Sequence, residues 1–217
     1  ARAPVHPANP LLADLTPGRM LGGLFIELAT RRRLRVNGHV AEATPEALHL
    51  KVTESFPNCP KFIQKRIFGG FSEATPSIPE VRAGTELGTA EQAWIRGADT
   101  LFLTTLHPGR GADSSHRGGP AGFVAVVDAT TLRLPDYAGN SLFQSFGNLE
   151  VDPRVALLLP DFATGALLHL SGTAQVRWDS EAGTGRSLEI QVNRWRVVPP
   201  AAGSPRWTFV EASPFNP

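Results

Sequence analysis

The chain has 217 residues, of which 41% are hydrophobic and 19% are charged, the balance of an ordinary globular protein. Its 21 basic and 20 acidic residues leave a formal net charge of +1, which is too small to indicate nucleic acid as a partner. The 21 glycines and 19 prolines favour many short strands joined by turns over a helical protein.

The sequence indicates a reducing compartment and no membrane segment. One cysteine, Cys59, excludes an internal disulfide. No apolar run approaches the ~18–20 residues of a membrane-spanning helix. The opening residues, ARAPVHPANPLL, lack an initiator methionine and the basic-then-apolar order of a signal peptide. We expect a cytoplasmic protein without a membrane partner, trimmed or beginning inside a longer reading frame.

An internal repeat is visible early in the chain. Residues 21–40 and 155–174 align without a gap at an offset of 134 positions. Each copy predicts a strand, a turn containing Ala-Thr, a second strand and a polar-Gly break. A true duplication is the favoured interpretation, and chance similarity between two hairpins is the alternative. The identical pairs are Leu24 and Leu158, Ala29 and Ala163, Thr30 and Thr164, Leu34 and Leu168, and Gly38 and Gly172.

The later elements include two helices. The first has Thr89 as its predicted N-cap with Gln92 three residues on, and the second is capped by Asn140 and stops near Gly147–Asn148. Residues 68–88, rich in Gly, Pro and Ser, predict a linker. In chain order we expect a helix over 89–98, a strand over 100–106, a turn over 107–113, a hairpin of 123–128 with 131–136, a helix within 139–153, and strands over 187–198 and 205–213.

These elements divide into a partial unit over 1–67, the linker over 68–88, and a complete unit over 89–217. Short strands with a few helices favour a small antiparallel barrel, and a β-sandwich is the alternative. Residues 89–154 precede the second copy of the repeat, but only 20 residues precede the first. The first barrel is therefore expected to lack its opening strands and to need another segment or chain to close it.

Several phrases between residues 89 and 175 carry a family resemblance, namely LFLTT, SSHRGGPAGFV, TLRLPDYAGNSLFQSFGNL and DPRVALLLPDF. In this order they resemble the pyridoxamine 5'-phosphate oxidase-like group of flavin-binding split barrels. SHRGG, PDYAGN and GNLxxxPRVALL resemble a tandem bacterial branch of that group, as do RRRLRVNG, SFPNCPKFIQKR and the closing WTFVEASPFNP. The implied fold class is a mainly β, FMN-binding split barrel in two tandem units, the first incomplete.

The resemblance implies FMN at an interface between two barrels. Such proteins are homodimers or fused pairs, so the implied partners are a second barrel, in a homodimer or within the chain, and a small-molecule substrate or electron donor. The strand that carries an Arg-hydrophobic-Lys phosphate pair in the oxidases reads SHRGGP here, without the lysine. The substrate therefore does not carry over, and no catalytic residue is assigned.

The stretch from Ser115 to Gly118 is the first candidate site. Arg117 can meet a flavin phosphate with two charge-assisted hydrogen bonds, and Ser115 can add a hydroxyl. Gly118 would let backbone N–H groups approach the phosphate. The alternatives are a solvated arginine in a turn and, for His116, either a proton donor near the flavin or a hydrogen-bonded loop histidine.

The second candidate site is PDYAGNS, which contains Asp136. Asn140 or Ser141 is expected to begin a helix over 141–149, whose free N–H groups favour an anion. Tyr137 can close the phosphate or ribityl site with its hydroxyl. An ordinary strand-to-helix connection, in which Asn140 only caps the helix, is the alternative.

The first unit offers two further groups of candidates. Alternation along RRRLRVNG puts Arg31, Arg33 and Arg35 on one face, where they repel unless an anion lies opposite. Arg33 and Arg35 are candidate contacts to a flavin held by the second barrel, and a charged edge strand is the alternative. In SFPNCPKFIQKR, Asn58 is the predicted N-cap of a helix, and Asn58 with Lys61 is expected to line the ligand pocket, whereas thiol chemistry at Cys59 is less favoured.

Other site classes find little support. The six histidines show no metal-binding spacing, and neither a P-loop nor a dinucleotide-binding glycine motif occurs. The sequence therefore predicts an FMN-binding flavoprotein, with oxidoreductase activity on an unknown small molecule as the favoured function. The alternatives are a non-catalytic flavin store, carrier or sensor, haem or deazaflavin as the ligand, and an incomplete site that binds no cofactor alone.

Overall fold

The computed structural model describes residues 14–44, 47–73, 80–139, 143–178, 184–200 and 202–217. Strands dominate the regular structure of these residues, so the mainly β prediction is confirmed. The elements in chain order are β1 (Met20–Glu27), β2 (Arg32–Ala43), β3 (Leu48–Asn58), β4 (Lys65–Phe71), β5 (Arg82–Gly84), α2 (Thr89–Gly97), β6 (Thr100–His107), β7 (Gly111–Gly118), β8 (Ala125–Val126), β9 (Thr131–Pro135), α3 (Gln144–Val151), β10 (Arg154–Pro160), β11 (Leu167–Arg177), β12 (Ser187–Val198) and β13 (Pro205–Glu211).

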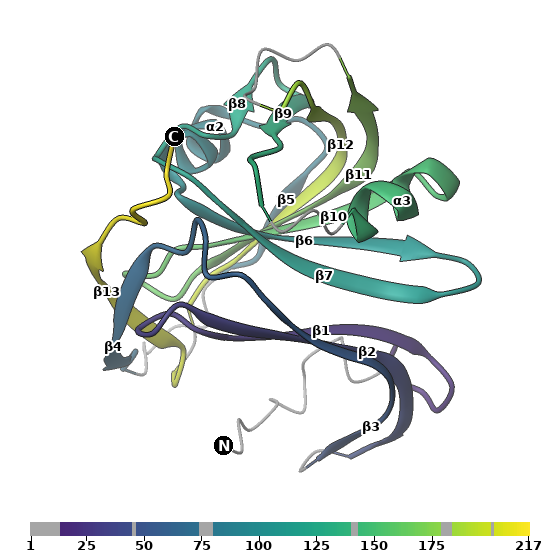
Figure 1. Cartoon of the computed structure of the whole chain (residues 1–217). Coiled ribbons are helices and arrows are strands. Elements are labelled where there is room, and N and C mark those ends of the chain that lie inside the picture. Colours follow the sequence, from purple (N-terminus) through teal and green to yellow (C-terminus); the bar gives the residue numbers. More distant parts are fainter. Residues whose placement is uncertain (1–13, 45–46, 74–79, 140–142, 179–183, 201) are drawn as a thin grey trace.

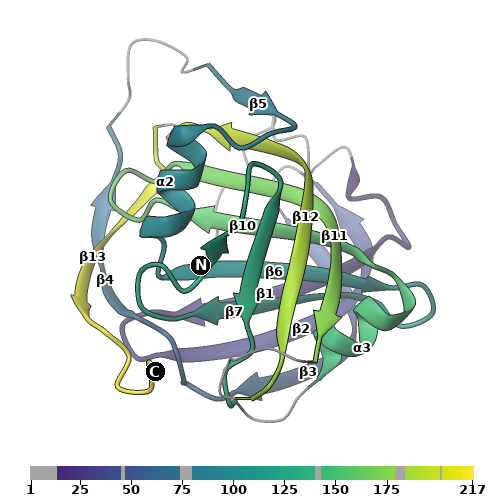
Figure 2. The same cartoon turned by 90° about the horizontal axis from the view of Figure 1, so that it is seen from above.

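A sheet of eight strands surrounds the main hydrophobic core. Its strands follow the order β7-β6-β10-β11-β12-β9-β8, and β5 also pairs with β12. Because alternate residues of a strand face one side, Leu101 and Leu103 of β6 and Leu188 and Ile190 of β12 are at most 1% exposed. Helices α2 and α3 lie far apart, near opposite ends of the sheet (Figure 2). Strand β7 is left at one edge of this sheet.

A second, three-stranded sheet with the order β1-β2-β3 lies against strand β7 (Figure 1). Its close approach requires Gly22, because a Cβ at that position would lie 2.8 Å from the carbonyl of Ala112. The Ser114 hydroxyl on β7 donates a 2.9 Å hydrogen bond to the Gly22 carbonyl. Farther along the chain, β4 pairs with β13 in a two-stranded ribbon. The N-terminal strands are therefore attached to the rest of the chain at two places.

The two copies of the repeat have the same strand register. Leu24 pairs with Arg35 in the β1–β2 hairpin, and Leu158 pairs with His169 in the β10–β11 hairpin, both at the sequence offset of 134. The second strand of each hairpin then pairs with the strand that follows it, β2 with β3 and β11 with β12. These pairings shift register at matching places, between Asn37 and Gly38 in one copy and between Ser171 and Gly172 in the other. The tandem arrangement stays a prediction, and these registers support it.

The polar stretch DSSHRG, 113–118, is strand and not turn. We expected a turn over 107–113, but β7 begins at Gly111 and pairs with β6 from His107 to Thr100. The serines and glycines of this stretch favour turns locally, whereas the ladder with the apolar strand β6 satisfies its backbone groups. Pairing partners, which the local sequence does not specify, decide its conformation.

The first predicted helix is present with a different N-cap. Helix α2 begins at Thr89, but the N-cap residue is Gly88, with extended backbone and no side-chain cap. The Gln92 side chain donates a 2.9 Å hydrogen bond to the Leu87 carbonyl instead of joining a capping box with Thr89. Thr89 is helical, so its hydroxyl cannot cap the helix as predicted.

The second predicted helix is shifted along the chain. Helix α3 begins at Gln144 after Phe143, and it continues through Gly147–Asn148 to Val151. The predicted stop was wrong because Gly147 lies in open space on the helix surface, where a glycine weakens a helix without ending it. The predicted cap, Asn140, lies outside the described residues.

Two other predictions, the linker over 68–88 and the helix cap at Asn58, differ from the structure. Strand β4 includes residues 68–71 and β5 covers 82–84. These two segments of the predicted linker are therefore strands. Asn58 ends strand β3 and is followed by a turn, so it does not cap a helix. The proline on either side of Cys59, at 57 and 60, is compatible with this strand end and turn. The division into units at 67 and 89 stays a prediction.

Gly172→Ala tests the close strand contact at the second irregularity. A Cβ there would lie 1.9 Å from the Gln191 carbonyl oxygen, and one at Gly38 would lie 2.2 Å from that of Lys51. We expect Gly172→Ala to lower the free energy of unfolding by about 1–3 kcal/mol in urea denaturation. The control is Gly147→Ala, whose Cβ meets nothing within 4 Å, and which we expect to stabilise the helix by about 0.5–1 kcal/mol. Equal effects of the two changes would contradict this account.

Candidate functional site

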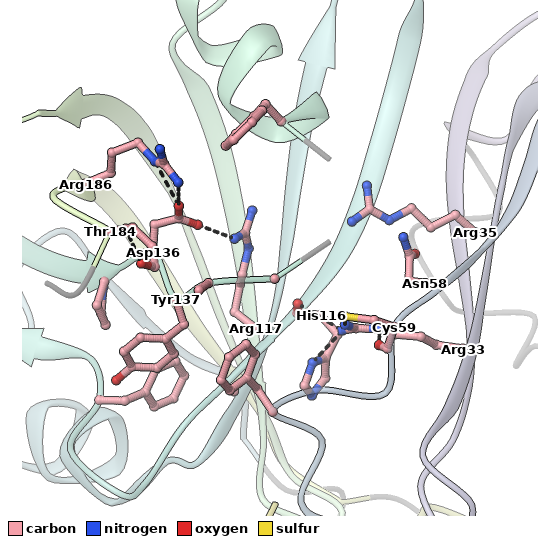
Figure 3. A pocket seen from close by; sticks show the side chains of 17 residues that line it. Arg33, Arg35, Asn58, Cys59, His116, Arg117, Asp136, Tyr137, Thr184 and Arg186 are labelled. Atoms are coloured by element: carbon pink, nitrogen blue, oxygen red, sulfur yellow. Dashed lines mark hydrogen bonds and ion pairs between the residues drawn. The ribbon is translucent and has the colours of Figure 1, made fainter. Parts of the chain in front are cut away.

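An arginine-lined cavity of about 200 Å³ lies between the two sheets (Figure 3). Strand β2 and the end of β3 form one wall, and β7, the end of β9 and residues 184–186 form the other. The cavity therefore joins residues that are far apart in the sequence. Its polar lining consists of Arg33, Arg35, Asn58, Cys59, His116, Arg117, Asp136, Tyr137, Thr184 and Arg186.

Strand β2 delivers two arginines to the cavity by simple alternation. Arg33 and Arg35 point towards β7, whereas Arg32 and Leu34 are exposed on the other face. Arg31 does not join them. It lies in the turn before the strand, at φ +57°, and its side chain donates to the Ile63 carbonyl at 2.9 Å. The predicted face of three cations is therefore a face of two.

Arg33 is held by two carbonyls, a histidine ring and a thiol instead of a carboxylate. Its Nε donates to the Cys59 carbonyl at 2.9 Å, and its Nη1 lies 3.0 Å from Nδ1 of His116. Nη1 also lies 3.4 Å from the His116 carbonyl, and Nη2 lies 3.8 Å from the Cys59 sulfur. In the part of the chain that the structure describes, no carboxylate pairs with Arg33. Its positive charge is therefore oriented but not neutralised.

Arg35 forms a buried ion pair with Asp113 across the two sheets. Its Nη1 lies 3.0 and 2.9 Å from the two carboxylate oxygens, and the side chains are 10% and 2% exposed. Asp113 also accepts hydrogen bonds from Asn37 at 3.2 Å and from Ser145 of α3 at 3.4 Å. The Arg35 charge is thus balanced by a carboxylate outside the cavity.

Arg117 and Arg186 share one carboxylate. Asp136 Oδ1 lies 3.4 Å from Arg117 Nη1, and its Oδ2 lies 3.0 and 2.9 Å from Nε and Nη2 of Arg186 (Figure 3). The Thr184 hydroxyl donates to the Asp136 carbonyl at 2.5 Å. The Arg186 guanidinium also lies 4.9 Å from the centre of the Phe143 ring. Asp136 is therefore a bridge that fixes two cations at the cavity.

The sequence did not indicate Arg186. Strand β12 pairs with β9 so that Ser187 lies opposite Pro135, and the Asp136 N–H donates to the Arg186 carbonyl at 3.1 Å. This pairing brings Arg186 beside Asp136, 50 residues earlier in the chain. A correct pairing of these two strands is the signal that would have identified it.

Aromatic side chains add a flat, apolar part to the lining. Phe62, Phe123, Tyr137 and Phe143 border the cavity, and the rings of Phe62 and Tyr137 are 5.3 Å apart. Phe62 reaches this position because the turn after β3 passes directly over Gly118, where a Cβ would lie 2.1 Å from the Phe62 carbonyl. Gly118 therefore gives clearance to this turn, and not only to a ligand as the sequence suggested.

The structure brings some predicted residues to the cavity and leaves others away from it. Asn58 lines the cavity, and its Oδ1 is buried without a partner in the described residues. Ser115 faces the other way, with its hydroxyl 3.4 Å from the Leu103 carbonyl and 3.3 Å from Ser145. Lys61 lies beside the cavity and donates to the Ala138 carbonyl at 3.3 Å. Asn140 and Ser141 lie outside the described residues.

Burial is the main electrostatic influence on the groups of this site. Removal from water lowers the pKa of Arg117, an effect that Asp136 opposes and that Arg35 and Arg33 reinforce. Burial likewise lowers the pKa of Arg33, and burial raises the pKa of the Tyr137 hydroxyl. Because arginine stays protonated in proteins, burial of Arg33 and Arg117 costs free energy, which a bound anion would offset.

His116 is neutral in this environment. Burial lowers its pKa well below the ordinary value, and the nearby charges of Arg33, Arg117 and Arg66 lower it further. The imidazole is only 6% exposed and also meets the edge of the Phe102 ring at 5.9 Å between centroids. A proton on this ring would add a fourth positive charge to the cluster.

Among the described residues, no group of three or more histidine, cysteine, aspartate or glutamate side chains could hold a metal ion. Within the same residues, no helix is long and apolar enough to cross a membrane.

Asp113→Ala tests the ion pair that joins the sheets. Removal of one partner leaves Arg35 buried with an unbalanced charge, so we expect the free energy of unfolding to fall by about 3–5 kcal/mol. The matched control is Arg154→Ala, which breaks the Arg154–Asp152 pair, whose arginine side chain is 68% exposed. We expect that change to cost less than about 1 kcal/mol in the same denaturant titration. A small loss for Asp113→Ala would show that the pair does not hold the sheets together.

The low pKa of His116 predicts a loss of stability in acid. In the unfolded chain His116 binds a proton as the pH falls below about 6.5, whereas in the folded protein it stays neutral. The free energy of unfolding therefore decreases as the pH falls through that value. His169, whose pKa burial also lowers, acts in the same direction. We expect His116→Asn to reduce the decrease in unfolding free energy between pH 7.5 and 5.5 by about 1.4 kcal/mol. An unchanged pH dependence in this variant would contradict the assignment.

The solved structures that resemble this protein match about half of the chain. A structure of HupZ from Group A Streptococcus is 11% identical with a TM-score of 0.43, over 54% of this chain and 98% of that chain. A putative pyridoxamine 5'-phosphate oxidase from Lactobacillus delbrueckii is 17% identical with a TM-score of 0.38, over 52% and 98%. General Stress Protein 26 from Bacillus anthracis is 16% identical with a TM-score of 0.37, over 54% and 94%. A search of curated protein sequences gives no match.

A protein-family model matches a longer part of the chain than these structures do. The model of the family described as pyridoxamine 5'-phosphate oxidase matches residues 87–210, more than half of the chain. This match confirms the resemblance seen in the sequence and, together with the strands described above, the expected mainly β split-barrel fold class. The chain therefore belongs to the pyridoxamine 5'-phosphate oxidase family.

Proposed function

We propose that the chain binds FMN in the arginine-lined cavity and acts as a flavin-dependent oxidoreductase on a small molecule. Arg33, Arg117 and Arg186 would hold the phosphate. The observation that carries this proposal is the excess of positive charge at the cavity. Family membership supports the proposed activity, because the family is named after an oxidase. The resemblance of the sequence supports FMN as the cofactor.

The charges that surround the cavity fit a phosphate monoester. Four arginines line it, and the carboxylates of Asp113 and Asp136 balance two of them. The remaining excess of two positive charges matches a phosphate group, which carries about −1.5 to −2 charges at neutral pH. In addition, Nε of Arg117 is buried and has no hydrogen-bond partner in the described residues. An anion at this place would offset the cost of crowding the guanidinium groups.

The rest of the lining suits a flat ring system. Phe62, Tyr137 and Phe143 offer aromatic surface beside the cations, and Asn58 offers an unpaired amide oxygen. Both kinds of group recognise a heteroaromatic ring with polar edges. When bound, the flavin would supply the hydride or electron transfer, and the residues of this chain would bind and orient it.

The cavity also bears on how the two predicted units of the chain pair. Both walls of the cavity come from one chain, which supports pairing of the two units within the chain. A homodimer built on top of this pairing, and a cytoplasmic location with a soluble electron donor, are part of the same proposal.

A second candidate function is non-catalytic flavin storage, transport or sensing. It is favoured by the state of the ionisable groups in the described lining, where Asp136 binds two arginines and His116 contacts Arg33. The Asp136 carboxylate and Nδ1 of His116 are both occupied by arginines, so neither is available to take a proton from a substrate. Slow bleaching of the bound flavin by reduced nicotinamide cofactor and other donors would favour this second function, and bleaching faster than that of free FMN would favour the oxidoreductase.

Arg117→Gln tests the phosphate site. Loss of a charge-assisted contact costs about 1.5–3 kcal/mol, so we expect FMN to bind roughly 10- to 150-fold more weakly. Riboflavin lacks the phosphate, and its affinity should change by less than about threefold. Quenching of flavin fluorescence measures both constants, and Arg154→Gln, an exposed arginine outside the cavity, should leave both unchanged. Equal losses for FMN and riboflavin, or wild-type protein that binds neither, would overturn the proposal.

A further inference from the structure

His116 and Arg33 meet in a way that fixes the position of a proton. Nη1 of Arg33 lies 3.0 Å from Nδ1 of His116, and a guanidinium has only donors. Nδ1 must therefore carry the lone pair, and the proton of the neutral ring must be on Nε2. In the described residues Nε2 is buried and has no hydrogen-bond partner. The Nδ1 edge of the His116 ring is thus turned towards Arg33.

The acceptors of Arg33 differ in kind from those of the other cavity arginines. Arg35 is paired with Asp113, and Arg117 and Arg186 are paired with Asp136. Arg33 is held by the His116 ring, the Cys59 carbonyl and the His116 carbonyl, which are neutral, and its Nη2 lies 3.8 Å from the Cys59 sulfur. A neutral acceptor restricts the guanidinium to one position and leaves its full charge available. A carboxylate at the same place would restrict it equally well but would cancel the charge.

We infer that His116 is a positioning residue. Its unprotonated Nδ1 holds the Arg33 guanidinium at the cavity, and the positive charge of Arg33 stays available for a ligand because no carboxylate of the described residues pairs with it. The inference rests on the proposed function, in which Arg33 contacts the phosphate. It assigns His116 no contact with the ligand and no proton transfer.

The surroundings of His116 keep it in the form that this role requires. Arg33 faces it from β2, Arg66 from β4 and Arg117 from its own strand, β7. A protonated ring would direct an N–H at the guanidinium and place two cations 3.0 Å apart. Arg33 would then leave its position, so burial, which is the main cause that excludes the proton, and the three nearby arginines together preserve the hydrogen bond.

Two variants of His116 separate positioning from simple packing. The Oδ1 atom of asparagine can replace Nδ1 as an acceptor, whereas leucine fills a similar space without an acceptor. We expect His116→Asn to bind FMN within about threefold of wild type and His116→Leu to bind it at least about tenfold more weakly. Riboflavin affinity should change little in both, and melting temperatures should show that both variants fold.

A double variant tests whether the two residues act together. If His116 acts through Arg33, His116→Leu should weaken FMN binding in the wild type but add almost nothing to Arg33→Gln. Additive losses, equal losses in the asparagine and leucine variants, or equal losses of FMN and riboflavin would each overturn the inference.

Nitrogen-15 NMR of the ligand-free protein tests the inference without any flavin. We expect His116 to show an unprotonated Nδ1 and a protonated Nε2 from pH 6.5 to 7.5, and Arg33→Gln to shift the Nδ1 resonance. A protonated Nδ1 would overturn the positioning role even if FMN binds. The expected tautomer together with a wild-type protein that binds no FMN would instead refute the proposed function, and with it the ligand that Arg33 is positioned to meet.

Discussion

The buried ion pair between Arg35 and Asp113 is the contact on which the candidate site depends. It joins β2 of the small sheet to β7 at the edge of the large sheet, and both side chains are at least nine-tenths buried. Asp113 also accepts hydrogen bonds from Asn37 and Ser145, so that three elements converge on one carboxylate. Because a buried charge is costly unless it is paired, the pair favours the arrangement of the two sheets that brings these groups together.

Once that register is set, the remaining cations have little freedom. Alternate residues of a strand share a face. Arg33 therefore lies on the same wall of the cavity as Arg35, two residues later, and Arg117 lies on the opposite wall, four residues after Asp113. The corresponding positions of the second hairpin hold Leu167 and His169 in place of Arg33 and Arg35. Burial lowers the pKa of His169, so that hairpin offers no comparable cationic wall. Of the two hairpins, only β1–β2 contributes arginines to the lining of the cavity.

Much of this arrangement could be predicted from local sequence patterns. The alternation in RRRLRVNG correctly placed Arg33 and Arg35 on the inward face, and the repeat correctly predicted two matching hairpins. Both predictions depend only on the two-residue period of a strand and on turn residues. The family resemblance led to Arg117, His116, Asp136 and Tyr137, which all line the cavity.

The errors share a physical cause, which is pairing between distant segments. Ser115 was assigned to the phosphate because it is close to Arg117 in sequence, but its hydroxyl faces Leu103 and Ser145. The local sequence predicts Asn58 as a helix cap, but Asn58 pairs with Arg33 and ends strand β3. Arg186 shows no local signal, because only the β9–β12 pairing brings it to Asp136.

A crystal structure of the protein grown with FMN would test the central claim most directly, by showing where the phosphate lies. The account predicts the phosphate within hydrogen-bonding distance of Arg33, Arg117 and Arg186, with the ring against Phe62, Tyr137 or Phe143. A flavin bound elsewhere, for example in the separate cavity between α2 and β13, would contradict it, as would a phosphate directed into solvent away from these arginines.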